Sequence, residues 1–340
     1  LQYTGGTTGV SKGAQLLHKN LVANMMQVRE LIVDILDGDR EVMIAPLPLY
    51  HIYAFTVSLV MSDMGHEMVL IPNPRDIPGF VKELSKHKFS SFAGLNTLFV
   101  ALCNNKEFNA LDFSHLKHTI SGGMALTEAA ASTWQNVTGC QIQEAYGLTE
   151  TSPAVSFNPY RDIRIGTIGK VVTGTQVKVI SEDGIDLGFD QEGELCVKGP
   201  QVMAGYWQRP EATAQVMDAD GWFKTGDVAI LAEDGFIRLV DRIKDMINVS
   251  GFNVYPNEID DIASQHSGIL ECAAVGIPNS VSGETVKLFV VKSDPNLTAD
   301  DVISHCREHL TAYKVPKEVE FRDDLPKTNV GKILRRALRE

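Results

Sequence analysis

The sequence predicts a chain of mixed α/β structure that continues into a β-rich region and ends in a smaller α+β unit. In residues 1–160, short apolar runs alternate with segments of helical spacing, which is typical of a largely parallel sheet covered by helices. From about Gly166, short β-like segments are separated by Asp-Gly turns. After Arg242, two apolar runs precede a segment with a helix-capping pattern.

The first region is expected to contain three strands and three helices. The strands are predicted at 41–49, 67–73 and 90–95, and the helices at 19–36, 78–87 and 127–138. Residues 42–62 carry no charge and are long enough to span a bilayer on count alone. Because Pro46 and Pro48 interrupt the first half of this run, it is interpreted as a strand, a loop and a buried helix, and no membrane span is expected.

The β-rich region is expected to form a small barrel or sandwich. Its strands are predicted at 175–181, 193–199 and 236–242, with turns at Asp183-Gly184, Asp220-Gly221 and Asp234-Gly235. The last unit has paired strands at 272–278 and 286–292, a helix from Thr298 to Tyr313 and a final helix from Lys332 to Arg339. These patterns divide the chain into regions 1–165, 166–241 and 242–340, with a short hinge near residue 242.

Composition excludes several classes of protein. The 340 residues carry 31 Lys and Arg against 43 Asp and Glu, a formal charge of −12, whereas a nucleic-acid-binding protein would present a basic face. The five cysteines show no CxxC or Cys/His spacing, which disfavours a zinc site or a disulfide framework and indicates a reducing, cytoplasmic location. Since the chain opens at Leu1 directly on a candidate ligand loop, we expect it to be a fragment whose sheet has an uncovered edge and whose activity is low.

A glycine-rich loop is the strongest local signal for ligand binding. Residues 3–13, YTGGTTGVSKG, contain four glycines, three threonines, a serine and a lysine, and they are expected to lie between a strand and a helix. Glycines let backbone N–H groups surround an anion, hydroxyls donate further bonds, and Lys12 supplies a charge. The loop matches neither GxxxxGK[ST] nor GxGxxG. The predicted phosphate-binding residues are Thr4, Gly5, Gly6, Thr7, Thr8, Gly9 and Lys12.

Two other interpretations of this loop stay open. Residues 9–13 satisfy GxSxG, the nucleophile elbow of α/β-hydrolases, with Ser11 as nucleophile. However, the six consecutive Gly and Thr residues at 4–9 separate this motif from the strand. Such a spacing fits a phosphate-binding loop better than a nucleophile elbow. A plain structural turn is the other alternative, and a nucleotide-binding module without enzymatic activity is a third class of function.

Six motifs resemble those of the adenylate-forming enzymes, the superfamily of acyl-CoA synthetases, luciferases and peptide-synthetase adenylation domains. After the glycine-rich loop they are LPLYHIYA, SGGMAL, EAYGLTE, GWFKTGDVA, VDRIKDMINVSGFNVYPNEID and PKTNVGKILRR, in the family's order. The resemblance implies the adenylate-forming enzyme fold: a large N-terminal domain, here partly missing, with a β-barrel subdomain, and a small mobile C-terminal domain. The hinge motif and KGPQVMAGYWQRPEAT are most similar to bacterial long-chain fatty acid–CoA ligases.

The resemblance implies a role for each motif residue around the nucleotide. Glu150 would ligate Mg²⁺, which prefers carboxylate and phosphate oxygens, and Thr149 would hydrogen-bond phosphate. Asp227 would accept the ribose hydroxyls, Arg242 would contact ribose or phosphate, and Lys332 would be the catalytic lysine. The adenine side would be formed by Gly122, Gly123, Tyr146 and Gly147.

The remaining implied residues concern the acyl group, CoA and the hinge. His51 would line the carboxylate end of the acyl site, although a lone histidine in an apolar run is often a core residue. Gly251 and Phe252 would line the pantetheine tunnel, and Lys244 would be the hinge. The family's lysine before this strand is Asn248 here, which puts a charged CoA contact at that position in doubt.

The implied activity is an ATP-dependent fatty acid–CoA ligase. A carboxylate would attack the α-phosphorus of Mg·ATP to give acyl-adenylate and pyrophosphate, and the thiol of coenzyme A would then displace AMP. Luciferase-like, amino-acid-activating, aryl or other acyl-CoA chemistry are the alternatives within the superfamily. The substrate partitions into lipid, so peripheral membrane contact is compatible with this activity, although no amphipathic basic helix indicates it. The sequence leaves the oligomeric state open, a homodimer included.

Overall fold

A computed structural model describes residues 1–4 and 11–339, and the chain divides into two compact units. The first unit holds most of the chain up to Leu239. The second holds the chain from Val240 on, together with the short segments Thr127–Ala129 and Gly226–Val228. Each unit has its own apolar core, and each is described separately below.

A seven-stranded sheet forms the centre of the first unit. Its strand order is β4-β3-β5-β6-β7-β8-β9, and the pairs from β4 to β7 are parallel whereas β8 and β9 run antiparallel. The strands are β3 (Val42–Ala45), β4 (Glu67–Leu70), β5 (Ser91–Gly94), β6 (His118–Gly122), β7 (Ile142–Gly147), β8 (Ala154–Phe157) and β9 (Lys170–Val171). The predicted strands of this region are confirmed, each shorter than expected.

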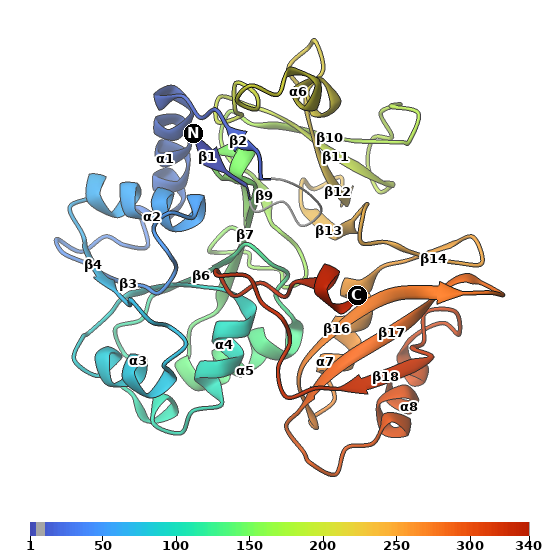
Figure 1. The fold of residues 1–340 in the computed structure, drawn as a ribbon. Helices are drawn as coiled ribbons and strands as arrows, with labels where there is room; N and C mark the ends of the chain where they lie inside the picture. Colours follow the sequence, from blue (N-terminus) through green and yellow to red (C-terminus); the bar gives the residue numbers. More distant parts are fainter. Residues whose placement is uncertain (5–10, 340) are drawn as a thin grey trace. The chain divides into compact units, whose positions relative to one another are not determined.

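Five helices cover this sheet, with α1 and α2 on one side and α3, α4 and α5 on the other (Figure 1). They are α1 (His18–Ile32), α2 (Ile52–Asp63), α3 (Ile77–Leu84), α4 (Asn96–Cys103) and α5 (Glu128–Thr138). The uncharged run at 42–62 is indeed a strand, a loop and the largely buried helix α2. Along the described chain, no helix combines the length and apolar character needed to cross a bilayer.

Aromatic packing fixes the helices to the sheet. Trp134 of α5 is fully buried, with its ring centroid 5.1 Å from Phe92 of β5 and 4.8 Å from Phe99 of α4. Burying rings of this size supplies a large share of the hydrophobic stabilisation, of the order of 1.5–3 kcal/mol each. A short 3₁₀ helix, η1 (Phe108–Ala110), adds Phe108 to the same cluster.

The glycine-rich loop joins two strands, which corrects the expected order of strand, loop and helix. Strand β1 (Gln2–Tyr3) pairs antiparallel with β2 (Gly13–Ala14), and helix α1 begins only at His18. The backbone N–H of Thr4 donates to the carbonyl of Lys12 at 2.9 Å, which closes the hairpin. Local sequence could not show β2, because its two residues are held by pairing rather than by their own propensity.

A four-stranded sheet follows, in the order β10-β11-β12-β13. Its strands are β10 (Gln176–Ile180), β11 (Glu192–Lys198), β12 (Phe223–Leu231) and β13 (Ile237–Arg242), and helix α6 (Pro210–Val216) lies between β11 and β12. The three predicted Asp-Gly turns are present, with Gly184, Gly221 and Gly235 at φ of 80°, 83° and 85°. Glycine suits these positions because L side chains are strained at positive φ.

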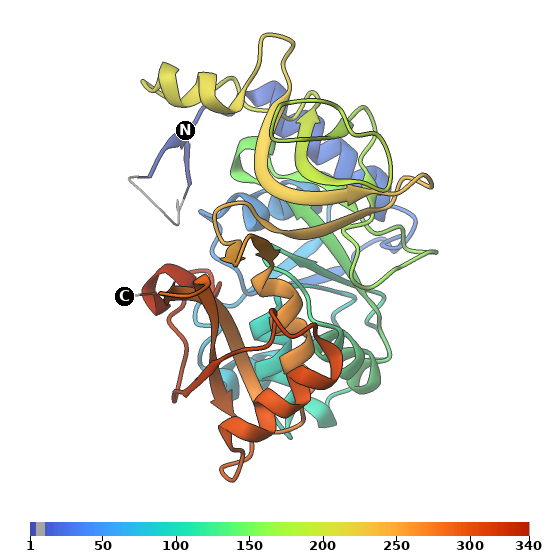
Figure 2. The same cartoon turned by 90° about the vertical axis from the view of Figure 1, so that its right-hand side faces the viewer.

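The second unit is built on a five-stranded sheet, β15-β14-β17-β16, with β18 beside β17. The elements are β14 (Ile247–Val249), β15 (Phe252–Val254), α7 (Pro256–Ser264), β16 (Ile269–Asn279), β17 (Gly283–Lys292), α8 (Ala299–His309), β18 (Glu318–Phe321) and η3 (Arg335–Leu338). Helices α7 and α8 lie together on one face of the sheet (Figures 1 and 2). The predicted pairing of 272–278 with 286–292 is confirmed, with Cys272 opposite Val290.

Two predicted helices of this unit are shorter than expected. Thr298 caps α8 by accepting from the N–H of Asp301 at 3.2 Å, but the helix ends at His309 because Leu310 is extended. The predicted helix from Lys332 to Arg339 is wrong at its start. Ile333 forms a β-bridge with Lys327, and only the 3₁₀ turn η3 is helical, so Lys332 lies in a tight turn.

Candidate functional site

Glu150 is a buried carboxylate with one fixed oxygen. It lies in the 3₁₀ turn η2 (Thr149–Thr151) directly after β7, and it is 9% exposed. The hydroxyl of Tyr206 donates to Oε1 of Glu150 at 2.6 Å, and the N–H of Met203 donates to its carbonyl at 2.8 Å. Among the described residues, neither carboxylate oxygen forms an ion pair with a Lys, Arg or His. Buried charges are normally paired or bind metal, so Glu150 fits a cation ligand.

The donor set around Glu150 suits a metal that arrives with its own phosphate ligands. No group of three or more His, Cys, Asp or Glu residues able to hold a metal is found in the part of the chain that the structure describes. Mg²⁺ in phosphate-transfer sites is commonly held by one or two carboxylates plus substrate phosphates. Glu150, whose Oε2 is not used by the Tyr206 hydrogen bond, is therefore compatible with Mg²⁺ bound to a nucleotide.

The glycine-rich hairpin is connected to Glu150 through Tyr206. The Nζ of Lys12 lies 4.7 Å from the centroid of the Tyr206 ring, in cation–π geometry. Tyr206 also forms an antiparallel bridge with Ala14 of β2. Burial and the charge of Glu150 raise the pKa of Tyr206 well above its usual value, so the phenol stays protonated. Sequence reasoning assigned no role to Tyr206.

Most of the predicted loop residues cannot be placed. Gly5, Gly6, Thr7, Thr8 and Gly9 lie outside the described residues. Ser11 is exposed and precedes strand β2 rather than opening a helix, so the strand–nucleophile–helix geometry of a hydrolase elbow does not occur there.

The predicted adenine-side residues lie at the ends of neighbouring strands β6 and β7. Gly122 is buried, and a Cβ there would lie 3.4 Å from the ring of Tyr53. Gly123 follows at a φ of 88° and is exposed. Tyr146 is buried in an apolar cluster at 9% exposure, so stacking on a base is not evident from its packing.

Gly147 has a structural reason for being glycine. A Cβ at this position would lie 1.9 Å from the carbonyl oxygen of Pro153, so any side chain is excluded by backbone. Its neighbour Thr149 is half-buried at the start of η2. Both residues remain predictions as nucleotide contacts.

Asp227, Arg242 and Lys332 come together in the second unit. Asp227 is 2% exposed, and Nε of Arg242 lies 3.2 Å from its Oδ1. Lys332 is half-buried, and burial followed by the nearby Arg242 charge lowers the pKa of its amine to about 8, while Asp227 opposes this shift. Three residues from three separate motifs therefore share one electrostatic environment.

The turn that carries Lys244 is bound to the C-terminal segment. Lys244 lies between β13 and β14, and Arg339 donates to the carbonyl of the next residue, Asp245, at 3.2 Å. Four residues before Arg339, Arg335 donates to Oδ2 of Asp260 at 2.8 Å and to Oδ1 of Asn257 at 2.7 Å. The side chain of Arg335 is therefore largely buried within the predicted 332–339 helix region.

Gly251 and Phe252 lie at the β14–β15 hairpin. Gly251 has a φ of 86°, and its N–H donates to Oδ1 of Asn248 at 2.9 Å. Phe252 is 56% exposed and stacks on Tyr313 with centroids 4.8 Å apart. Asn248 thus has a turn-capping role, which the sequence did not reveal.

His51 has a structural contact of its own. It is the N-cap of α2, and its Nδ1 accepts from the N–H of Tyr53 at 3.3 Å. The five cysteines, Cys103, Cys140, Cys196, Cys272 and Cys306, are free and buried. Burial raises the pKa of each of these thiols, so none has the thiolate character of a nucleophile.

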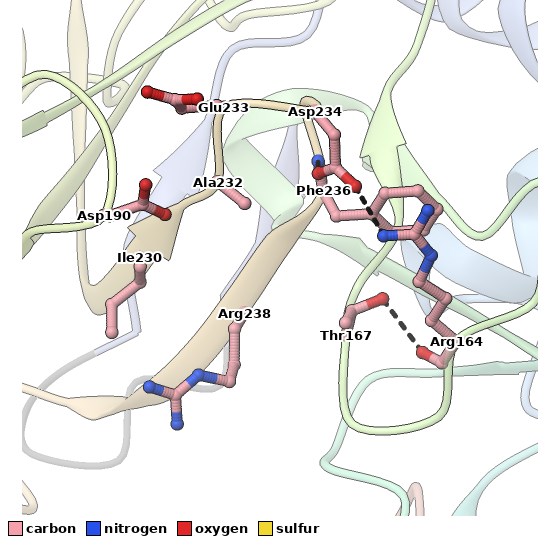
Figure 3. Close-up of a pocket in the computed structure, with 9 residues that line it drawn as sticks. All are labelled: Arg164, Thr167, Asp190, Ile230, Ala232, Glu233, Asp234, Phe236 and Arg238. Atoms are coloured by element: carbon pink, nitrogen blue, oxygen red, sulfur yellow. Dashed lines mark hydrogen bonds and ion pairs between the residues drawn. The ribbon is translucent and has the colours of Figure 1, made fainter.

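A pocket of about 650 Å³ in the first unit contains none of the predicted site residues (Figure 3). Among its lining residues, Arg164 lies over the ring of Phe236, with Cζ 3.6 Å from the centroid, and pairs with Asp234 at 2.5 Å. The lining also includes Asp190, Glu233 and Arg238.

Comparison with known proteins decides the family. The model of the AMP-binding enzyme family matches residues 1–207, and that of the AMP-binding enzyme C-terminal domain matches residues 258–332. The chain belongs to the AMP-binding enzyme family. The long-chain-fatty-acid–CoA ligase of Salmonella typhimurium is 56% identical over 342 residues, covering 100% of this chain. The chain spans 61% of the length of that relative.

Solved structures show the same fold. ATP-bound MatB from Rhodopseudomonas palustris superposes with a TM-score of 0.89 at 33% identity, over 99% of this chain and 66% of that chain. The anthranilate CoA ligase AuaEII in complex with anthranoyl-AMP has a TM-score of 0.92 at 28% identity, over 100% of this chain and 66% of that chain. The AMP-binding family thus has the adenylate-forming enzyme fold predicted from the motifs.

Proposed function

We propose that this protein is an ATP-dependent long-chain fatty acid–CoA ligase. The observation that carries the proposal is the cluster of Lys332, Asp227 and Arg242. It joins the proposed ribose carboxylate to a lysine whose pKa is lowered to about 8 by burial. The 56% identity with a relative of that name supports the choice of substrate. The proposed regions are 1–165, 166–241 and a mobile 242–340, in a cytoplasmic protein that contacts membranes peripherally.

In the first step, a carboxylate oxygen attacks the α-phosphorus of ATP, and the bond to the pyrophosphate leaving group breaks. Lys332 in its protonated form stabilises the charge that grows on the phosphate oxygens, and Asp227 holds the ribose through its hydroxyls. Glu150 and the nucleotide phosphates would hold Mg²⁺, which neutralises phosphate charge. The glycine-rich loop, with Thr4 and Lys12 at its described ends and Thr149 nearby in sequence, would bind the phosphates.

In the second step, the thiolate of CoA attacks the acyl carbon, and AMP leaves. No side chain needs to act as a nucleophile, which agrees with the raised pKa of every cysteine. Gly251 and Phe252 would guide the pantetheine arm, His51 would face the carboxylate end of the acyl group, and Lys244 would be the pivot between the two steps. Gly122, Gly123, Tyr146 and Gly147 would border the adenine.

A substrate panel tests this proposal. Long-chain, short-chain, aryl and amino acids are supplied with Mg·ATP, with and without CoA, and AMP and acyl-CoA are quantified. The expected result is CoA-dependent AMP release that is greatest with long-chain fatty acids. A preference for aryl acids, such as the substrate named for the anthranilate ligase, would move the proposal to another acyl-CoA ligase. ATP-independent ester hydrolysis abolished by Ser11→Ala would favour a hydrolase instead.

A further inference from the structure

We propose that Tyr206 is a positioning residue of the nucleotide site: its hydroxyl orients Glu150 for the metal ion of the metal–ATP complex, and its ring holds Lys12 at the base of the phosphate loop. This inference rests on the proposed function, since it takes Glu150 as the metal ligand. It adds a residue that neither the motif comparison nor the family match assigns.

The hydroxyl fixes the rotation of the carboxylate. Tyr206 donates to Oε1 of Glu150 at 2.6 Å, in the range of a charge-assisted hydrogen bond. Among the residues whose placement is described, Oε2 has no hydrogen-bond partner. Because Oε1 is held, Oε2 has a defined direction and keeps its lone pairs for a cation.

The backbone around Tyr206 fixes both ends of this contact. The N–H of Trp207 donates to the carbonyl of Gly13 at 2.8 Å, and the N–H of Gln15 donates to the carbonyl of Gly205 at 2.9 Å. Residues 204–207 therefore lie beside β2, with an isolated bridge between Ala14 and Tyr206. One residue further back, Met203 donates its N–H to the carbonyl of Glu150 at 2.8 Å. A single stretch, 203–207, thus holds the phosphate hairpin and the metal-binding turn together.

The ring gives Lys12 a defined resting position. Its Nζ lies 4.7 Å from the ring centroid, so the ammonium is kept near the loop it serves while no phosphate is bound. Phosphate offers a stronger partner and would draw the side chain off the ring. Tyr206 therefore contacts both the carboxylate of Glu150, through its hydroxyl, and the ammonium of Lys12, through the face of its ring.

Nucleotide binding by the full-length protein tests the hydroxyl. Binding of α,β-methylene-ATP is measured by calorimetry at a series of Mg²⁺ concentrations, which requires no turnover. Tyr206→Phe keeps the ring and removes the donor, so the Mg²⁺ concentration for half-maximal enhancement should rise about 10-fold, the usual scale for losing a partner that orients a metal ligand. Binding without Mg²⁺ should stay unchanged. Tyr206→Leu removes the ring as well and should also weaken binding without Mg²⁺.

Controls separate this role from general damage. Thr138→Val deletes another buried hydroxyl of the same unit, which donates to the Trp134 carbonyl at 2.8 Å, and should leave the Mg²⁺ dependence unchanged. In a Glu150→Gln background, Tyr206→Phe should have no further effect, because the two side chains act as one unit. If neither variant folds, 3-fluorotyrosine at position 206, a stronger donor, should shift the same midpoint.

Two results would overturn the inference. An unchanged Mg²⁺ midpoint in Tyr206→Phe, or an equal shift with and without Glu150, would show that the hydroxyl does not act through the carboxylate. Failure of the proposed function is distinguishable, because then nucleotide binding by the wild-type protein would itself be absent or independent of Mg²⁺. Near-ultraviolet circular dichroism of each variant confirms that the fold is retained.

Discussion

Lys332 shows how a residue's surroundings set its chemistry. A lysine in water is fully protonated near neutrality, whereas burial beside Arg242 lowers the pKa of Lys332 to about 8. The neighbouring carboxylate of Asp227 limits this shift, so the amine stays mostly protonated at pH 7. The turn that holds it is closed by the Thr328 N–H donating to the Lys332 carbonyl at 2.8 Å.

Removing this charge should separate the two half-reactions. Lys332→Ala should slow adenylate formation by roughly 10²–10³, the cost of losing one preorganised charge donor. Thioester formation from supplied acyl-adenylate should be much less affected, because no phosphate charge builds up in that step. Pyrophosphate exchange and single-turnover thioesterification measure the two steps. Equal losses in both would show that Lys332 has a structural role.

The same amine predicts a pH dependence. The protonated form is the active one, and a folded-state pKa of about 8 means that this form is lost as the pH rises through 8. The kcat/KM for adenylate formation should therefore fall above pH 8, whereas kcat should fall at higher pH because bound phosphate favours the charged amine. Profiles from pH 6 to 10 check this. A rise in kcat/KM through pH 8 would mean that the neutral amine is required.

Motifs in the sequence identified Glu150 as a candidate site residue, but they did not reveal which side chain contacts it. Glu150 and Tyr206 are 56 positions apart, and nothing in local periodicity links a phenol to a distant carboxylate. The same holds for Arg335 and Asp260, which are 75 positions apart. Only the folded chain shows that these polar groups are buried. Because a buried polar group needs a hydrogen-bond partner, burial explains why these contacts form.

At the scale of elements, strands and helices with strong internal periodicity were predictable. Strands β16 and β17 are each predicted by an apolar run in their own residues. Helix α8 is predicted by its cap at Thr298. Strand β2 and the Lys327–Ile333 bridge are held by partners elsewhere, so local sequence indicated a loop and a helix instead. The roles assigned to the motif residues at the ends of these elements stay predictions.

The β14–β15 hairpin tests the position of CoA. Gly251→Leu should block thioester formation while pyrophosphate exchange survives, because the added side chain occupies the proposed pantetheine path. A Cβ at this position has no atom within 4 Å, so the block must come from the ligand side. Since φ is 86°, strain alone could disturb the turn. Gly251→Asn, which tolerates this φ, is the matched control, and full CoA-dependent turnover by the Leu variant would place the arm elsewhere.

The C-terminal segment is tied to α7 by a buried ion pair. The side chains of Arg335 and Asp260 are 16% and 14% exposed, and Arg335 also donates to the Ala274 carbonyl at 3.1 Å. Arg335→Met leaves the carboxylate without its cation, which should cost about 3–5 kcal/mol of unfolding free energy. Denaturant unfolding followed by a probe in the second unit measures this. The double variant with Asp260→Leu should recover much of the loss, and a loss under 1 kcal/mol would contradict the pairing.

At the scale of the whole molecule, the two units divide the proposed chemistry. The first carries the phosphate loop, Glu150 and Tyr206, and the second carries Lys332, Asp227 and Arg242. Composition alone placed the chain among acidic globular proteins, which agrees with local rather than global attraction of the nucleotide. The division into regions 1–165, 166–241 and 242–340 stays a prediction.

Oxygen transfer tests the central claim, that a carboxylate attacks the α-phosphorus. A long-chain fatty acid labelled with ¹⁸O in its carboxylate is converted to the CoA thioester by the full-length protein, and the products are analysed by mass spectrometry. The account predicts one ¹⁸O atom in AMP and none in pyrophosphate, since thiolysis of the acyl-adenylate leaves a carboxylate oxygen on phosphorus. AMP without label, or label in inorganic phosphate with release of ADP, would contradict it.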